Sequence, residues 1–182
     1  WNDISSAAPK TPFIIYNIPQ LAGVSLTMSL FNEMLKNPMV QGVKNSSMPV
    51  QDIQMFKMYG GSEFTVFNGP DEQFVSGRLI GADGGIGGTY AVMSELFIKA
   101  DLFVNNGENE KARDIQTDID RIIYKMCSAK GNLYAVMKEI IKRREGLDLG
   151  SVRLPLAPLY PEDESVVVEA IELIDKAISK WV

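Results

Sequence analysis

Four short apolar runs, each followed by a helical pattern, restrict the fold of this chain more than any other feature. The runs lie at 12–16, 40–44, 64–67 and 81–88, and the last is so rich in glycine that we expect only a very short strand there. Apolar residues at helical spacing follow each run, at about 26–35, 50–58, 71–80 and 89–103. This alternation predicts an α/β fold with a parallel sheet and right-handed crossovers.

The remainder of the chain predicts helices without strands. We expect helices at about 112–126, 131–144 and 163–180, with an extended connection at 154–158. Residues 1–9 resemble the end of a helix. Ser25 is available as the N-cap of the helix expected at 26–35. We therefore expect residues 1–105 to hold four βα units and residues 106–182 to form a helical extension of the same domain.

Composition removes several classes of function. The 182 residues are 46% apolar and 23% charged, and the net charge of −5 gives no support for binding nucleic acid. No apolar run approaches the ~20 residues that cross a membrane. The single cysteine, Cys127, excludes an intrachain disulfide and favours a reducing, cytoplasmic compartment. We expect Cys127 to be a buried structural thiol, because it lies in a helical pattern.

The chain has no histidine, which limits its chemistry further. A Ser-His-Asp or Cys-His nucleophilic site is excluded, and a zinc site is disfavoured, so we expect no metal. Any acid–base step must then use lysine, tyrosine, a carboxylate or a group of the substrate.

Polar residues follow the predicted strands at the end where parallel α/β proteins bind ligands. The glycine-rich loop offers backbone amides there, but it lacks the Gly-Lys-Ser/Thr of a phosphate loop and the register of a dinucleotide motif. One amine, one phenol, two carboxylates and this loop are expected at a single rim: Tyr16, Lys44, Asp71, Glu72 and 84–88.

Each of these side chains has an ordinary explanation beside the chemical one. Lys44 can extend its amine out of a strand end into water, or, where it is shielded, lose its proton and attack a ketone to form an imine. Tyr16 can be a core tyrosine or a proton carrier. Asp71 and Glu72 can be first-turn helix residues or hydrogen-bond acceptors for a polyol substrate. Their shared rim favours the chemical explanation.

Four segments, in this order, resemble the N-acetylneuraminate lyase branch of the pyruvate-dependent class I aldolases, which includes dihydrodipicolinate synthase. The segments are Tyr16-Asn17-Ile18-Pro19, Gly42-Val43-Lys44, Gly69-Pro70-Asp71-Glu72 and Gly81 to Tyr90. The resemblance implies the C-terminal half of a TIM (β/α)8 barrel, about four βα units followed by C-terminal helices.

The same resemblance implies roles for individual residues. Lys44 would form a Schiff base with pyruvate, and Tyr16 would transfer protons. The covalent pyruvate imine on Lys44 would be the only adduct required, with no cofactor. The Gly-x-Asp-Glu segment favours sialic acid lyase over dihydrodipicolinate synthase. The implied substrate-binding residues are Ser46, Gly69, Asp71, Glu72, Ile86 and Gly88.

Two substitutions and one absence separate the chain from that pattern. Ser46 stands where these lyases usually have threonine and keeps the hydroxyl, whereas Gly88 stands where they usually have serine. The Gly-Gly-Thr-Gly-Glu-like stretch that binds the pyruvate carboxylate in the family has no counterpart. We therefore expect the C-terminal part of a longer enzyme, or a half-barrel that covers its open sheet edges with a partner.

The function expected from this resemblance is cleavage of N-acetylneuraminate to pyruvate and N-acetylmannosamine. Alternatives are another pyruvate-dependent aldolase acting on a 2-keto-3-deoxy sugar acid, a dihydrodipicolinate synthase-like condensation, and a non-catalytic half-barrel module. The expected partners are a sugar acid and pyruvate, without nucleic acid or membrane. The resemblance also implies a homotetramer, or association with the missing N-terminal barrel half, and the isolated chain could be inactive.

Overall fold

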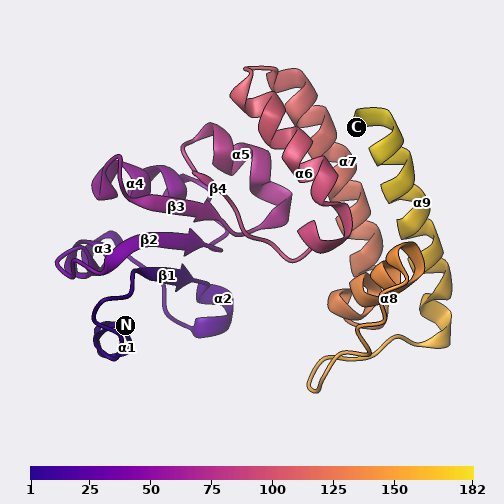
Figure 1. Cartoon of the computed structure of the whole chain (residues 1–182), viewed down its shortest axis with the longest axis horizontal. Helices are drawn as coiled ribbons and strands as arrows, with labels where there is room; N and C mark the ends of the chain where they lie inside the picture. Colours follow the sequence, from indigo (N-terminus) through magenta and orange to yellow (C-terminus); the bar gives the residue numbers. More distant parts are fainter. The chain divides into compact units, whose positions relative to one another are not determined.

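The computed structural model describes residues 1–182, which form two compact units, 1–87 and 88–182. The first unit contains a four-stranded parallel sheet in the order β1-β2-β3-β4, so every neighbouring strand is also the next along the chain (Figure 1). The strands are β1 (Phe13–Asn17), β2 (Val40–Asn45), β3 (Thr65–Asn68) and β4 (Gly84–Gly85). All four predicted runs are therefore strands, and β4 has only two residues, as its glycine content predicts.

The helices of the first unit follow the strands in the predicted alternation. Their bounds are α1 (Asn2–Ser6), α2 (Pro19–Ala22), α3 (Met28–Met34), α4 (Gln51–Gly60), the 3-10 turn η1 (Asp71–Gln73) and α5 (Phe74–Leu79). The expected N-cap of α3 was wrong. Thr27, not Ser25, is the N-cap, and its side chain accepts a hydrogen bond from the N–H of Leu30. Leu26 precedes the helix and is buried.

The two faces of this sheet differ in what covers them. One, the covered face, carries Ile15, Val43 and Val66, which are fully buried beneath α3 and α4. Phe31 of α3 anchors this core, with its ring centroid 4.8 Å from that of Phe56 of α4. Burial of these apolar side chains supplies the driving force for the unit.

The opposite face of the sheet, here called the open face, carries the alternate residues of each strand. Ile14 and Tyr16 project from it and are 39% and 47% exposed. Tyr16, Lys44 and Phe67 lie side by side on this face, because the register pairs Tyr16 with Lys44 and Lys44 with Phe67. Tyr16 is thus not a core tyrosine.

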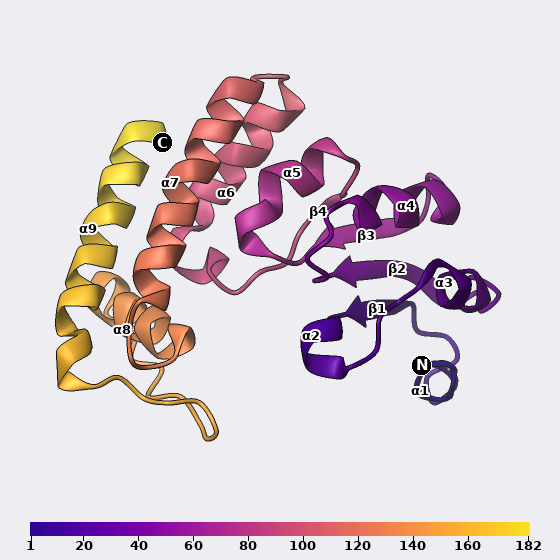
Figure 2. The ribbon, with the colours of Figure 1, turned by 180° about the vertical axis from the view of Figure 1, so that it is seen from behind.

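The second unit is helical (Figure 2). Its elements are α6 (Tyr90–Asn105), α7 (Asn109–Cys127), α8 (Leu133–Glu145), the 3-10 turn η2 (Pro161–Asp163) and α9 (Glu164–Trp181). The predicted apolar face of α7 is confirmed, since Ile115, Ile119 and Met126 are fully buried. Against it packs α9, which buries Val167, Ala170 and Ile174.

The predicted burial of Cys127 was wrong, because the thiol is exposed. Cys127 is the last residue of α7 and directly follows the buried Met126. Successive residues of a helix point about 100° apart, so a residue next to the buried face turns toward solvent when no other element covers it.

No helix of the chain is both long and apolar enough to cross a bilayer.

Candidate active site at the carboxyl edge of the sheet

The carboxyl edge of the sheet is the row where its strands end, and an asparagine stands at three of its four positions. The register aligns Asn17 with Asn45, Asn45 with Asn68, and Asn68 with Gly85. All three asparagines are at most 2% exposed. Their side chains lie on the covered face, one residue beyond the Tyr16–Lys44–Phe67 row on the open face.

Lys44 and Tyr16 meet on the open face. The Lys44 Nζ lies 4.0 Å from the centroid of the Tyr16 ring, which is cation–π geometry. Lys44 is half-buried, whereas Tyr16 remains accessible. The structure therefore brings together the predicted nucleophile and the predicted proton carrier.

Gly42 lies on the same open face, paired with Ile14 of β1 and Thr65 of β3. A Cβ added there would lie 2.5 Å from the backbone oxygen of Thr65 and 2.8 Å from Cδ1 of Ile14. Only glycine fits between these two atoms without moving a strand. The glycine two residues before Lys44 is thus required by packing.

The carbonyls of the three asparagines hold three of the predicted substrate-binding residues. The N–H of Ser46 donates to the Asn17 carbonyl at 2.8 Å, and the N–H of Gly69 donates to the Asn45 carbonyl at 2.8 Å. In the same way, the N–H of Ile86 donates to the Asn68 carbonyl at 2.9 Å. The strand ladder therefore continues one hydrogen bond past each strand and fixes these backbones at the edge.

Ser46 and Gly69 also contact each other directly. A Cβ built on Gly69 would lie 2.0 Å from the Ser46 Oγ and 2.7 Å from the Asn45 carbonyl oxygen. The Ser46 hydroxyl therefore occupies the space that any side chain at 69 would need. The close approach of β2 and β3 at this point explains a glycine here.

The two neighbouring carboxylates have different surroundings. Asp71 is 8% exposed, and its carboxylate lies over the backbone of Gly87, where an added Cβ would be only 1.5 Å from Oδ1. Glu72 is exposed. Asp71 thus packs on the glycine-rich loop, whereas Glu72 is accessible to solvent; their predicted role as acceptors for a polyol stays a prediction.

Two further predicted residues lie on or after the glycine-rich loop. Ile86 follows β4 and is 45% exposed. Gly88 belongs to the second unit, where an added Cβ would lie 2.9 Å from Cε1 and 3.1 Å from the hydroxyl of Tyr134. Tyr134 therefore fills the space beside Gly88 that a serine side chain would enter.

The sequence-based prediction gave no role to the three asparagines or to Ser47. A signal for them was present, because an asparagine directly follows the Tyr16, Lys44 and Phe67 positions in three successive runs. Only the register shows that these residues are neighbours across the sheet.

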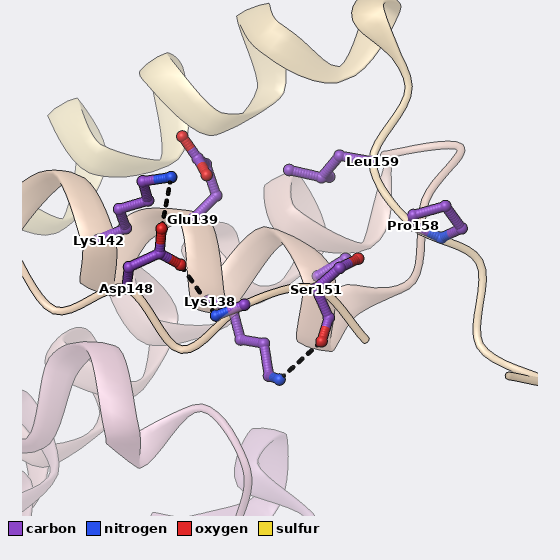
Figure 3. Close-up of a pocket in the computed structure, with 9 residues that line it drawn as sticks. Lys138, Glu139, Lys142, Asp148, Ser151, Pro158 and Leu159 are labelled. Carbon is purple, nitrogen blue, oxygen red and sulfur yellow. Dashed lines mark hydrogen bonds and ion pairs between the residues drawn. The ribbon is translucent and has the colours of Figure 1, made fainter. Parts of the chain in front are cut away.

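A cavity in the helical unit has no free amine (Figure 3). It has a volume of about 370 Å³ and is lined by α8 and the loop after it. Lys138 donates to the carbonyls of Leu149 and Ser151 at 3.3 and 3.0 Å, and Lys142 is ion-paired with Asp148 at 2.9 Å. The hydrogen bond and charge of Asp148 raise the pKa of Lys142, so this amine is held as an ammonium.

No group of three or more Asp, Glu or Cys side chains in the chain is arranged to hold a metal ion. The carboxyl edge itself carries an amine, a phenol, hydroxyls and a carboxylate. These groups can carry out covalent carbonyl chemistry, in which an amine makes the bond and a phenol moves protons.

The fold and this edge identify the chain as a parallel α/β protein with an accessible amine–phenol pair. It belongs to the dihydrodipicolinate synthetase family, which its residues 1–174 match. The predicted family and α/β fold are confirmed. The roles assigned to individual site residues remain predictions.

Two proteins illustrate this similarity. The N-acetylneuraminate lyase of Mediterraneibacter gnavus is 62% identical over 181 residues, covering 100% of this chain and 58% of that protein. The wild-type sialic acid aldolase of Ruminococcus gnavus superposes with a TM-score of 0.97 at 62% identity, covering 100% of this chain and 60% of that one. A catalytic lysine mutant of the same aldolase gives a TM-score of 0.98 at 61% identity, with the same coverage.

The chain thus spans about three-fifths of the length of the relatives it matches. The matched region is their C-terminal part, and the α/β unit aligns with the corresponding part of their aldolase barrels.

Proposed function

We propose that this chain carries the Schiff-base lysine of an aldolase that cleaves N-acetylneuraminate to pyruvate and N-acetylmannosamine. The observation that supports this most directly is the Lys44 amine on the open face, 4.0 Å from the centroid of the Tyr16 ring. Similarity to N-acetylneuraminate lyases supports the substrate, and a relative described by its catalytic lysine supports the use of an amine.

The reaction begins at Lys44. Its neutral amine attacks the keto carbon of the open-chain sugar acid, and loss of water leaves a protonated imine. The bond between the carbon next to the imine carbon and the hydroxyl-bearing carbon beyond it then breaks, and its electron pair moves toward the imine nitrogen. The hydroxyl proton on the leaving carbon passes to a base, and an aldehyde departs. The resulting enamine takes a proton at carbon, and water hydrolyses the imine to release pyruvate.

Tyr16 supports the proton steps of this sequence. The register sets the phenol beside the amine, on the side of the sheet that solvent reaches. General acid–base groups of this kind contribute about 10²–10⁴-fold to rate. Glu72, which is exposed next to the edge, is the proposed acceptor for hydroxyls of the sugar chain.

Borohydride trapping tests the proposal on the intact native protein. Reduction in the presence of pyruvate should leave a single 1-carboxyethyl group, the reduced form of the pyruvate imine, and peptide mass mapping should locate it on Lys44. Lys36→Ala is the matched control, since Lys36 is an exposed lysine that pairs only with Glu33 on α3. Absence of an adduct, or an adduct that survives Lys44→Ala, refutes the proposal.

A second substrate is favoured by the surroundings of Gly88. The family pattern implied by the resemblance has serine at position 88, whereas here the Tyr134 ring fills the space beside Gly88. Such a site suits a 2-keto-3-deoxy sugar acid with fewer hydroxyls. Comparing kcat/KM across sugar acids decides between them: rapid turnover of N-acetylneuraminate with poor activity on the others excludes this alternative.

Other expectations stay predictions. The proposed covalent imine requires no separate cofactor, and we propose a homotetramer in a reducing, cytoplasmic compartment. The mass of the native, unproteolysed protein tests the non-catalytic half-barrel alternative, because a mass matching full-length relatives excludes it. Sedimentation of the same preparation tests the tetramer.

A further inference from the structure

Behind the amine–phenol pair, on the covered face, a chain of hydrogen bonds links the ends of β1 and β2. The backbone N–H of Leu26 donates to Asn17 Oδ1 at 3.1 Å, and Asn17 Nδ2 donates to Asn45 Oδ1 at 2.7 Å. Asn45 Nδ2 then donates to Ser47 Oγ at 2.9 Å, and the Ser47 hydroxyl donates to Asp52 Oδ2 at 2.7 Å.

The direction of these bonds is the same throughout. Each amide accepts on its oxygen and donates through its nitrogen, and the chain ends on a carboxylate, the strongest acceptor. Ser47 Oγ also lies 3.0 Å from Asn45 Oδ1, but its single proton is better placed on the nearer, charged oxygen of Asp52. Bonds aligned in this way polarise one another in a buried site.

The ends of this chain are anchored in rigid elements. Asp52 lies in the first turn of α4, where the helix dipole favours a carboxylate. At the other end, Leu26 is buried in the core of the sheet unit. Asn17, Asn45 and Ser47 are 2%, 1% and 4% exposed, so water has little access to their bonds.

We propose that Asn17, Asn45, Ser47 and Asp52 form a positioning chain that fixes the distance between Lys44 and Tyr16; the catalytic part of this inference rests on the proposed aldolase function. Tyr16 and Lys44 directly precede the two bonded asparagines, and the register pairs them in the same way. A change in the separation of Asn17 and Asn45 therefore changes the separation of the amine and the phenol. A misplacement of 1 Å in a reacting group can cost about 10²-fold in rate.

Ser47→Ala is the variant that tests this chain with the least change in volume. It removes the acceptor of Asn45 and the donor to Asp52 and leaves both strands intact. Ser47→Thr is the rescue variant because it keeps the hydroxyl. Ser47 lines a cavity of about 270 Å³, which has room for the added methyl group.

Asn37→Ala is the matched control. Asn37 is also an asparagine with several hydrogen bonds: its Nδ2 donates to Asn2 at 2.9 Å and its Oδ1 accepts from the N–H of Met39 at 3.0 Å. It precedes β2 at the opposite, amino edge of the same sheet. A general loss of stability affects both variants, whereas loss of positioning affects only Ser47→Ala.

The first measurement does not depend on catalysis. Because the Lys44 Nζ lies over the Tyr16 ring, the ring current should move the neighbouring ε-methylene protons upfield in the NMR spectrum. We expect Ser47→Ala to move this signal toward its random-coil position, and Ser47→Thr and Asn37→Ala to retain it. An unshifted signal in the unmodified protein, or an unchanged shift in Ser47→Ala, overturns the inference whether or not the protein is an aldolase.

The second measurement joins the inference to the reaction. In the intact native protein, the rate of borohydride-trapped imine formation from pyruvate should fall about 10-fold or more in Ser47→Ala, while KM changes less than kcat, and Ser47→Thr should restore it. If the unmodified protein traps no pyruvate, the proposed function fails and the NMR result alone judges the positioning chain. An equal loss in Asn37→Ala, or trapping within twofold in a folded Ser47→Ala, refutes positioning of the amine.

Discussion

Gly69→Ala should separate the ends of β2 and β3, and its cost can be estimated from three contacts. The new Cβ would lie 2.0 Å from the Ser46 Oγ, 2.7 Å from the Asn45 carbonyl oxygen and 2.9 Å from the Ser46 Cβ. The hydroxyl can rotate away, but the carbonyl oxygen and the Cβ move only with the backbone. An ordinary contact of 3.4 Å with the carbonyl requires a shift of about 0.7 Å.

That shift would also stretch the 2.8 Å bond between the Gly69 N–H and the Asn45 carbonyl beyond hydrogen-bonding range. Overpacking costs about 1–3 kcal/mol, and a lost hydrogen bond adds about 0.5–1.5 kcal/mol. We therefore expect the sheet unit to lose about 1.5–4.5 kcal/mol, together with an increase in KM for the sugar acid.

Gly84→Ala is the control for this prediction. It lies in β4 of the same sheet, and its added Cβ would meet only ring atoms of Phe67, at 3.7 and 3.8 Å, which is ordinary contact. Native-state hydrogen exchange of the buried Val43 and Val66 amides reports the free energy of opening of this unit alone. Losses in Gly69→Ala and Gly84→Ala that agree within about 0.5 kcal/mol would show that the steric reasoning is wrong.

Three further perturbations should give distinct results. Backbone N–H groups, led by that of Tyr160, lower the pKa of Asp163. The stability that this carboxylate contributes is therefore present above the usual carboxyl value of 3.8 and is lost as pH falls below it. Asp163→Asn should flatten this loss of stability at acid pH in denaturation curves, whereas Glu162→Gln, at an exposed neighbour, should leave it unchanged. Gly88→Ser should displace the Tyr134 ring, seen as a changed ring-proton spectrum, and an unchanged spectrum would contradict the packing. Thr27→Ala should cost about 1 kcal/mol in urea unfolding through loss of an N-cap, and Thr27→Ser should recover most of it.

Much of the fold could be predicted because its signals are local. The runs that became β1, β2 and β3 combine apolar and β-branched residues between turn residues, and this pattern needs no partner to be recognised. The burial of Ile115 and Ile119 follows from helical spacing in the same way. Cys127 and Ser25 were predicted wrongly because helix ends depend on what covers the last turn and on which residue has cap geometry.

Of the candidate site, the residue types could be predicted from the sequence, whereas their surroundings could not. Lys44, Tyr16, Asp71 and Glu72 could be proposed because each follows a buried run at the same end of the predicted sheet, in a chain that has no histidine for acid–base chemistry. The different surroundings of Asp71 and Glu72 could not be predicted, because they depend on where the glycine-rich loop packs. Neighbouring residues in a sequence carry no sign of which one a distant loop will bury.

The sequence by itself determined the strands and the parallel order of the α/β units, and it singled out Lys44 as the candidate amine, because each depends on residue type and local period. Tertiary structure decided which residues meet: Tyr16 with Lys44, and Asn17 with Asn45. These pairs lie 28 residues apart in sequence and are joined only by the register of β1 against β2. Register is set by core packing on the covered face, and it places the amine and the phenol together on the open face.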